Sequence, residues 1–433
     1  MIKAHKIRLN PTPEQADYLR RAAGTRRFVY NWGLDQWQKH YAAYQEAQTK
    51  DTTQQTVKPP TALALKQQFN AIRAKEFPWS YAVTKCAVEG AFFDLGDAYK
   101  RFFSGQNQPP KFKKKGRSHE SFYIANDKLT IGDRWVQIPV LGDFILTQHE
   151  ANGTQTVAIK NRTSYKRTLG RINLAENLRY ITTDGHPTPA RRPHARKQVF
   201  CGSVKIVGAT VSCKGGHWYI SIQVEIPHII VPNTKPILGV DVGIKEAAVV
   251  SDGRRFENQK PLTTHLPKLR RLHHQLSKKH YDPATKRGSQ NREKAKLKLS
   301  RCYDGITCIR IDAQHKLTTA IAKTCSILGL EDLHVKGMVK NRKLARAMAD
   351  AALGQLLKLF ATKMAGVDGR AILVHRFFPS TKTCSGCGHV KKRMPLKYRT
   401  YICLQCGLHM DRDLNAAINL EREVRRILSR GAG

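Results

Sequence analysis

The chain has 433 residues, enough for about three domains, and its 75 lysines and arginines far exceed its 33 aspartates and glutamates. The formal net charge of +42 indicates a polyanionic partner, because binding to phosphates releases their counterions. No apolar stretch is long enough to cross a bilayer and the first residues do not resemble a signal peptide, so we expect a cytoplasmic protein that binds nucleic acid and no membrane.

One strand and three helices are predicted in the first 103 residues. The strand covers 3–9, and the helices cover 13–44, 61–76 and 82–103. In the third helix Phe92, Tyr99 and Phe103 recur at helical spacing, which predicts a core. Lys85 and Glu89 lie one turn apart on the same helix, where they would face solvent or nucleic acid.

A basic loop follows the third helix and reads P-P-K-F-K-K-K-G-R from Pro109. Its lysines are Lys111, Lys113, Lys114 and Lys115. A run of charge is most often only solvated, but the net charge of this chain favours phosphate contacts by these side chains.

The pattern becomes strand-like between residues 122 and 226, which predicts a β-rich domain such as a small barrel. The stretch 148–197 is less regular, polar and rich in arginine and proline, and we interpret it as a basic insertion. Residues 232–236 then form a predicted linker to the last domain.

A hairpin is predicted at residues 237–250, which read I-L-G-V-D-V-G-I-K-E-A-A-V-V. Side chains alternate across a strand, so Asp241 shares a face with Gly239 and Gly243. A carboxylate between glycines leaves room for a metal ion, a backbone or nucleic acid to come close. Taken alone, however, this pattern is more typical of an edge-strand acid beside a turn.

A second acid has the same setting later in the last domain. Glu331 ends the apolar run 326–330 and shares a face with Gly329, which argues against coincidence. The other elements expected in this domain are a basic helical region at 266–299, helices at 303–325 and 341–364, and a strand at 370–378.

Four of the ten cysteines form two C-x2-C pairs with 15 residues between them. The pairs are Cys384 with Cys387 and Cys403 with Cys406, and a glycine follows each pair. Paired cysteines in a chain without a secretion signal predict a zinc ribbon rather than disulfides. A closed four-thiolate site is structural. The insert between the pairs is basic and aromatic, and Arg399 in it is placed to reach a phosphate.

The last predicted helix starts in D-R-D-L-N-A-A-I-N-L. Asp411 or Asp413 would serve as its N-cap in the simplest interpretation. Ala416 and Ala417 lie three and four residues after Asp413, so the helix can pack closely on a sheet and bring that carboxylate over it.

Three carboxylates in a basic protein suggest a two-metal site for phosphodiester hydrolysis, since Mg²⁺ prefers hard oxygen ligands. Two of them, Asp241 and Glu331, lie on predicted strands and the third, Asp413, lies on a predicted helix. Their spacing in the sequence does not establish that they converge.

The order of the motifs resembles the TnpB family of transposon-encoded RNA-guided nucleases, which are related to type V CRISPR effectors. G-V-D-V-G-I-K, the strand before Glu331, F-P-S-T-K-T-C-S-G-C-G and D-R-D-L-N-A-A-I-N-L occur in that order. T-R-R-F-V-Y-N-W and A-Y-K-R-F-F match the front of the family. The resemblance therefore covers most of the chain.

The resemblance implies a multidomain α+β protein. It places a RuvC-type nuclease domain with an RNase H-like fold at 237–433, containing the zinc ribbon at 380–410. Residues 10–120 would be a helical recognition domain, and 1–9 with 121–231 a wedge β-barrel that carries the insertion. The stretch 148–197 looks longer than a compact member needs.

The family's catalytic acids match Asp241, Glu331 and Asp413, the last because the family's motif centres on the acid of D-x-N. They imply Mg²⁺ or Mn²⁺ as cofactor beside Zn²⁺. The implied partners are a guide RNA and double-stranded target DNA with a short flanking motif, so the protein would associate with the nucleoid. Lys85 and Glu89 would lie in the region that reads this motif.

Three other functions stay open on the sequence. A catalytically silent RNA-guided repressor would keep the binding regions but has no need of all three acids. A transposase or transposase accessory protein is compatible with the same acids. A zinc-ribbon RNA-binding protein leaves the glycine-flanked acids unexplained.

Overall fold

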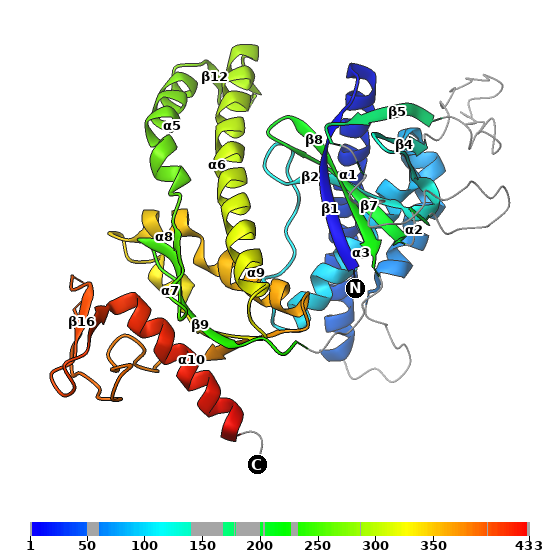
Figure 1. Cartoon of the computed structure of the whole chain (residues 1–433). Coiled ribbons are helices and arrows are strands. Elements are labelled where there is room, and N and C mark those ends of the chain that lie inside the picture. Colours follow the sequence, from blue (N-terminus) through cyan, green and yellow to red (C-terminus); the bar gives the residue numbers. More distant parts are fainter. Residues whose placement is uncertain are drawn as a thin grey trace, which may run out of the picture. The chain divides into compact units, whose positions relative to one another are not determined.

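The computed structural model describes residues 2–49, 60–139, 168–176, 178, 200–201, 204–226, 233–285, 287–395 and 397–430 (Figure 1). Most of the predicted insertion at 148–197 lies outside these residues. The chain forms two compact units, Met1–His228 and Ile229–Gly433. No helix in the described part of the chain is both long and apolar enough to cross a membrane.

The helices of the first unit confirm the prediction of three long helices. They are α1 (Pro13–Thr49), α2 (Ala62–Glu76) and α3 (Lys85–Phe103), with the short 3-10 helix η1 (Pro78–Ala82) between the last two. Phe92 and Tyr99 are buried in the core that these helices share. Phe103 differs from the prediction because it ends α3 and is 56% exposed, with ring contacts to Tyr41, Tyr99 and Phe102.

The strands of the first unit form one eight-stranded antiparallel sheet. They are β1 (Ile2–Asn10), β2 (Glu120–Ala125), β3 (Thr130–Ile131), β4 (Trp135–Pro139), β5 (Thr168–Leu174), β6 (Phe200–Cys201), β7 (Val204–Lys214) and β8 (His217–Glu225), with the 3-10 helix η2 (Asn126–Lys128) after β2. The order is β2-β7-β8-β1-β5-β4-β3, and β6 pairs with β7. No ladder joins β3 to β2 among the described strands, so the expected barrel is not closed there.

The second unit is built on a five-stranded sheet in the order β11-β10-β9-β14-β15. The strands are β9 (Ile237–Asp241), β10 (Glu246–Val250), β11 (Arg255–Glu257), β14 (Ile327–Glu331) and β15 (Arg370–Val374). β9 and β10 pair antiparallel, which confirms the predicted hairpin. β14 lies between β9 and β15 and is parallel to both.

Helices cover both faces of this sheet. The helices of the second unit are α5 (Pro261–Ser277), α6 (Gln290–Ala322), α7 (Val335–Met338), α8 (Ala345–Ala351), α9 (Leu353–Ala365) and α10 (Arg412–Arg430). α6 and α9 pack on the face that carries Leu238 and Val240, and α10 packs on the opposite face. The single helix predicted at 341–364 is two helices, because Ala352 adopts the left-handed conformation with φ +48°.

Two small ribbons complete the second unit. β12 (Tyr281–Asp282) pairs with β13 (Arg287–Gly288) at the end of the α5–α6 hairpin. β16 (Thr400–Ile402) pairs with β17 (His409–Asp411) directly before α10.

Candidate functional site

Asp241 and Glu331 end two neighbouring parallel strands of the second unit. The register pairs Gly239 with Gly329 and Leu330 with Val240, so the next residues along β9 and β14 place the two acids side by side. Gly239 and Gly329 face α10. Residues two apart along a strand point to the same face, so Asp241 and Glu331 also point to the face that α10 covers. The structure thus brings two of the three predicted acids to one edge of the sheet.

The third acid is brought to this edge by the close packing of α10. A Cβ atom added at Gly239 would lie only 2.0 Å from the carbonyl oxygen of Ala417. At Gly329 an added Cβ would lie 2.7 Å from Cγ2 of Val424. The helix therefore touches the sheet where the strands have no side chains, and Ala416 and Ala417 are fully buried against it. Asp413 lies in the first turn of this helix.

Electrostatic interactions indicate that the three carboxyl groups share one site. The pKa of Asp241 is raised well above its usual range, chiefly by burial and then by the negative charges of Asp413 and Glu331. Burial also raises the pKa of Glu331. All three residues remain partly exposed at the surface although their surroundings are dense. A cation at this edge would relieve the repulsion, and carboxylate oxygens are the ligands that Mg²⁺ prefers.

The arrangement is more open than a cage for one ion. Within the described ranges, only four cysteines form a group of three or more metal-binding residues whose ligand atoms all lie within 4.8 Å of one another. The three acids interact without forming so tight a set. Carboxylates at this edge would hold Mg²⁺ ions, which would supply Lewis-acid chemistry for phosphodiester hydrolysis.

Two arginines offset the charge of Asp413. Nε and one terminal nitrogen of the buried Arg412 donate to Oδ1 of Asp413 at 3.0 and 2.9 Å. Arg399 approaches the other carboxylate oxygen at 3.8 Å. Arg412 also donates to the carbonyl oxygen of Tyr398 at 3.2 Å. The guanidinium of Arg412 therefore links Asp413 to the segment between the two cysteine pairs.

Asp411 has a different environment and acts as the N-cap of α10. Its Oδ1 accepts hydrogen bonds from the backbone nitrogens of Asp413 and Leu414, both at 3.0 Å. Arg255 of β11 lies 3.2 Å from the same oxygen. Burial acts to raise the pKa of Asp411, but the bonds from Leu414 and Arg255 outweigh it and the pKa is lowered. Asp411 therefore orients the turn that carries Asp413.

The four paired cysteines form the cluster that the sequence predicts. Sγ of Cys384 lies 3.6 Å from that of Cys406, and Sγ of Cys387 lies 3.6 Å from that of Cys403. A tetrahedron with Zn–S bonds of about 2.3 Å places its sulfurs roughly 3.8 Å apart. The cluster therefore suggests Zn²⁺. Each pair is followed by a glycine with positive φ, Gly388 and Gly407, which lets the chain turn back over the site.

Two buried asparagines that the sequence reasoning missed fasten the ribbon to α10. Asn415 accepts from the backbone nitrogen of Ser385 at 2.9 Å and donates to the carbonyl oxygen of Thr383 at 2.7 Å. Asn419 donates to Thr383 and to the carbonyl oxygen of Ser380. The sequence could have indicated these two residues, because their spacing of four in D-R-D-L-N-A-A-I-N-L places both asparagines on one face of a helix.

The residues predicted to contact nucleic acid in the first unit have mixed surroundings. Glu89 pairs with Lys66 at 3.0 Å, and Lys85 is half-buried in the first turn of α3. Lys113 differs from its neighbours because its Nζ lies 3.6 Å from the ring centroid of Tyr30. Burial, and next the charge of Arg26, lower the pKa of Lys113 to about 8. The other three lysines of the basic loop are exposed: Lys111, Lys114 and Lys115.

Three family models match separate parts of the chain. A helix-turn-helix domain of the IS605 OrfB group matches residues 1–46, and an IS605 OrfB model described as a probable transposase matches 221–342. The third is a Cas12f1-like TNB domain at residues 354–420, which spans the cysteine cluster and the first half of α10.

Curated relatives match along almost the whole chain. A "Putative RNA-guided DNA endonuclease" from Streptomyces pristinaespiralis is 28% identical over 96% of this chain and 88% of its own length. The "Putative RNA-guided DNA endonuclease InsQ" from Escherichia coli K12 is 27% identical over 97% of this chain and 91% of its own length.

A solved structure shares the fold. It is the cryo-EM structure of a Cas12f1–sgRNA–target DNA complex, in which the matched protein is 15% identical. The match has a TM-score of 0.56 and covers 95% of this chain and 83% of that protein. The similarity extends over both units.

Proposed function

This chain belongs to the IS605 OrfB/TnpB family, and from that premise we propose that it is an RNA-guided DNA endonuclease. It would hydrolyse phosphodiester bonds of DNA that lies next to a short flanking motif. The placement of Asp241, Glu331 and Asp413 at one edge of the second-unit sheet is the observation that carries the proposal.

In this proposal the three acids are the catalytic residues and the ligands of two Mg²⁺ or Mn²⁺ ions. Ions in such a site activate a water molecule and stabilise the leaving oxygen. Asp241 and Glu331 are fixed by the parallel pairing of β9 and β14, and the cap formed by Asp411 fixes the turn of Asp413. Arg399 is half-exposed beside Asp413 and would contact the phosphate being cut.

We also propose the domain organisation that the family implies. Residues 237–433 would be the RuvC-like nuclease domain, with the ribbon at 380–410 held on α10 by its zinc site. Residues 10–120 would form the helical recognition domain. The remaining parts, 1–9 and 121–231, would form the wedge domain, and the central place of β1 between β8 and β5 supports joining them.

Guide RNA and target DNA are the proposed partners. Lys111, Lys114 and Lys115 present exposed charges for phosphate contacts, and Lys85 would face the flanking DNA. Lys113 would contribute less, because its side chain is already packed on Tyr30.

The proposal is tested with the RNA that copurifies with the protein. This RNA is sequenced, and the complex is offered a plasmid library that carries the matching target beside a randomised flank. We expect Mg²⁺-dependent cutting at targets that share one flanking motif. Bound RNA with specific DNA binding and no cutting would instead support the silent repressor. Absence of bound RNA would refute guided recognition, and joining of transposon ends would support a transposase.

A further inference from the structure

The helices α5 and α6 form an arm on the second unit. We define the arm as α5, the β12–β13 ribbon and residues 290–306 of α6. The helices α5 and α6 run side by side in Figure 1, and the β12–β13 ribbon lies between their ends. A narrow apolar seam holds the two helices together. Its buried members are Leu269, Leu272, Leu299, Cys302 and Ile306. Because the seam uses only one stripe of each helix, most of the arm's surface is open to solvent.

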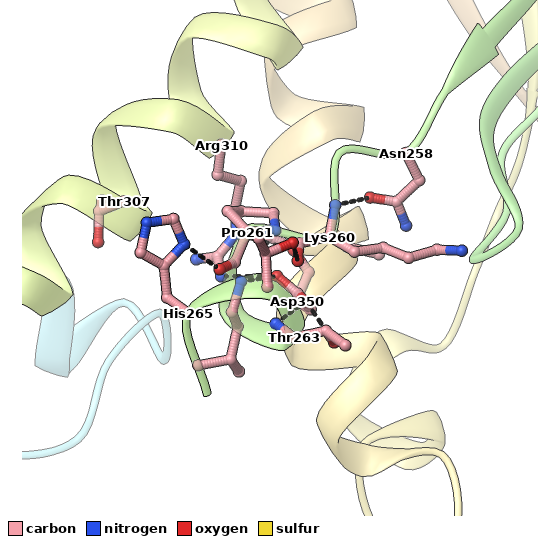
Figure 2. A network of polar contacts seen from close by, with 12 residues as sticks. Asn258, Lys260, Pro261, Thr263, His265, Thr307, Arg310 and Asp350 are labelled. Atoms are coloured by element: carbon pink, nitrogen blue, oxygen red, sulfur yellow. Dashed lines mark hydrogen bonds and ion pairs between the residues drawn. The ribbon is translucent and has the colours of Figure 1, made fainter. Parts of the chain in front are cut away.

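The base of the arm is fixed by a buried acid. Asp350 of α8 is 2% exposed and accepts hydrogen bonds from the backbone nitrogens of Leu262 and Thr263, each at 2.9 Å. Arg310 of α6 donates through Nε to the carbonyl oxygen of Asp350 at 2.8 Å (Figure 2). One residue therefore ties the first turn of α5 and the middle of α6 to the body of the unit, so the arm has a defined position within it.

The exposed surface of the arm is strongly basic. Seven of its exposed cations have no ion-pair partner within the stretches that the structure describes: Lys268, Arg270, Arg271, Lys278, Lys279, Lys294 and Lys298. The arm has only two acids before residue 304, and both are engaged. Asp282 accepts from Thr285, and Glu293 pairs with Lys296.

These cations follow the axis of the arm. At 100° per residue, Lys268, Arg271 and Lys278 fall within about 80° of one another, and at 1.5 Å per residue they span about 15 Å. Lys294 and Lys298 lie one turn apart on α6. A line of charges of this length matches a repeating polyanion rather than a single small anion, since duplex DNA carries one negative charge per about 1.7 Å of its axis.

The aromatic residues of the arm favour a double-stranded partner. Single strands are usually held by free rings on which bases stack. The two exposed tyrosine rings of the arm both contact other side chains of the arm. The guanidinium of Arg292 lies 4.9 Å from the ring centroid of Tyr281, and Tyr303 shares a 2.9 Å hydrogen bond with His273. The exposed charges of the arm are thus available to phosphate backbones, whereas its two tyrosines already have partners within the arm.

We propose that the arm binds the phosphate backbone of a double-helical nucleic acid. The inference rests on the proposed RNA-guided function, within which the duplex is either a helix of the guide RNA or a helix that contains target DNA. Both present the same phosphate chemistry, and contact through the cations alone is independent of sequence.

The test compares two triple variants with the same loss of charge. In the first, Lys268, Arg271 and Lys278 on the arm become glutamine. In the second, glutamine replaces three exposed lysines of the same unit that lie off the arm: Lys235, Lys323 and Lys358. Both are made in the Asp241→Ala background to prevent cutting. The probes are a DNA duplex, an RNA duplex of the same sequence and the matching single strands.

The dissociation constant is measured against salt concentration for each probe. The arm variant should lower the slope of log Kd against log salt by roughly 2 to 3 for a duplex, because each lost phosphate contact removes about 0.9. The off-arm variant should keep the parent slope. A reduction only with the RNA duplex assigns the arm to guide RNA, and a reduction only with the DNA duplex assigns it to target DNA.

Equal slopes for the two triple variants would overturn the inference, because net charge would then explain the whole effect. A larger effect on single strands than on duplexes would also overturn it. The readout is binding, so it stays separate from the nuclease assignment, which is tested by Mg²⁺-dependent cutting with the parent protein.

Discussion

Substituting alanine for Gly239 tests whether the catalytic geometry depends on the close packing of α10. The added Cβ would lie 2.0 Å from the carbonyl oxygen of Ala417 and 2.5 Å from the backbone nitrogen of Glu421. An ordinary contact begins at 3.4 Å, so helix and strand must separate by 1.4 Å, the difference between 3.4 and 2.0 Å. Both clashing atoms are backbone, so rotation of a side chain cannot relieve the contact.

The separation should affect stability and catalysis together. Overpacking of this kind costs about 1–3 kcal/mol. In a unit of about 200 residues this lowers the melting temperature by roughly 2–12 °C. A displacement of about 1 Å can also cost roughly 100-fold in rate, and Asp413 moves with the helix. Thermal unfolding and single-turnover cleavage at saturating RNA measure the two effects.

Gly305→Ala is the matched control. Gly305 is exposed in α6 and an added Cβ meets nothing within 4 Å. Alanine favours a helix over glycine by about 1 kcal/mol, so this variant should be as stable as the parent or more stable and should cut normally. If Gly239→Ala matched Gly305→Ala in both assays, the account of the helix–sheet contact would be refuted.

Three further variants test separate parts of the molecule. Burial and two acidic neighbours raise the pKa of Asp241, so the folded metal-free protein binds this proton more tightly and loses stability as pH rises above about 4. Asp241→Asn should therefore raise the melting temperature in chelator at pH 7, with a gain that shrinks on acidification; a gain independent of pH would contradict this. Asp350→Ala leaves Arg310 without its carboxylate and should cost about 3–5 kcal/mol in denaturant unfolding, and a loss below 1 kcal/mol would exclude the proposed anchoring role. Cys387→Ser should remove one bound zinc per chain by elemental analysis, whereas the exposed Cys308→Ser should keep it.

Local patterns in the sequence predicted much of the second unit. Alternation along 237–241 and 327–331 identified the face shared by the glycines and acids, and the hairpin is confirmed. Ala416 and Ala417 indicated close packing of the last helix, which the contact at Gly239 explains. These predictions were possible because side chains repeat every two residues along a strand and about every 3.6 residues along a helix, so the sequence alone indicates the face on which each residue lies.

The polar network around Asp413 was not predicted. The pairing of Arg255 with Asp411 joins positions far apart in the chain, and the sequence indicated Asp411 only as a candidate N-cap. Lys113 looked equivalent to its neighbours in a run of lysines, but its loop lies against Tyr30 of α1. These interactions depend on tertiary contacts, and periodicity carries no information about them.

The arrangement of the first-unit strands was also beyond the local pattern. Strand character at 122–226 was correct, since β2, β7 and β8 lie there. Whether a sheet closes depends on pairing between its first and last strands, which alternation does not specify. The strand order of this sheet, from β2 at one end to β3 at the other, could therefore be determined only from the structure.

The central claim is that Asp241, Glu331 and Asp413 cut DNA while Asp411 only positions the helix. Its most direct test is single-turnover cleavage by the RNA-loaded protein carrying Asp241→Ala or Asp413→Ala, compared with Asp411→Asn, which keeps an N-cap. We expect the first two to bind RNA and target normally and to lose cutting by at least about 1,000-fold, and the third to keep measurable cutting. Parent-like cleavage by Asp241→Ala or Asp413→Ala would contradict the account.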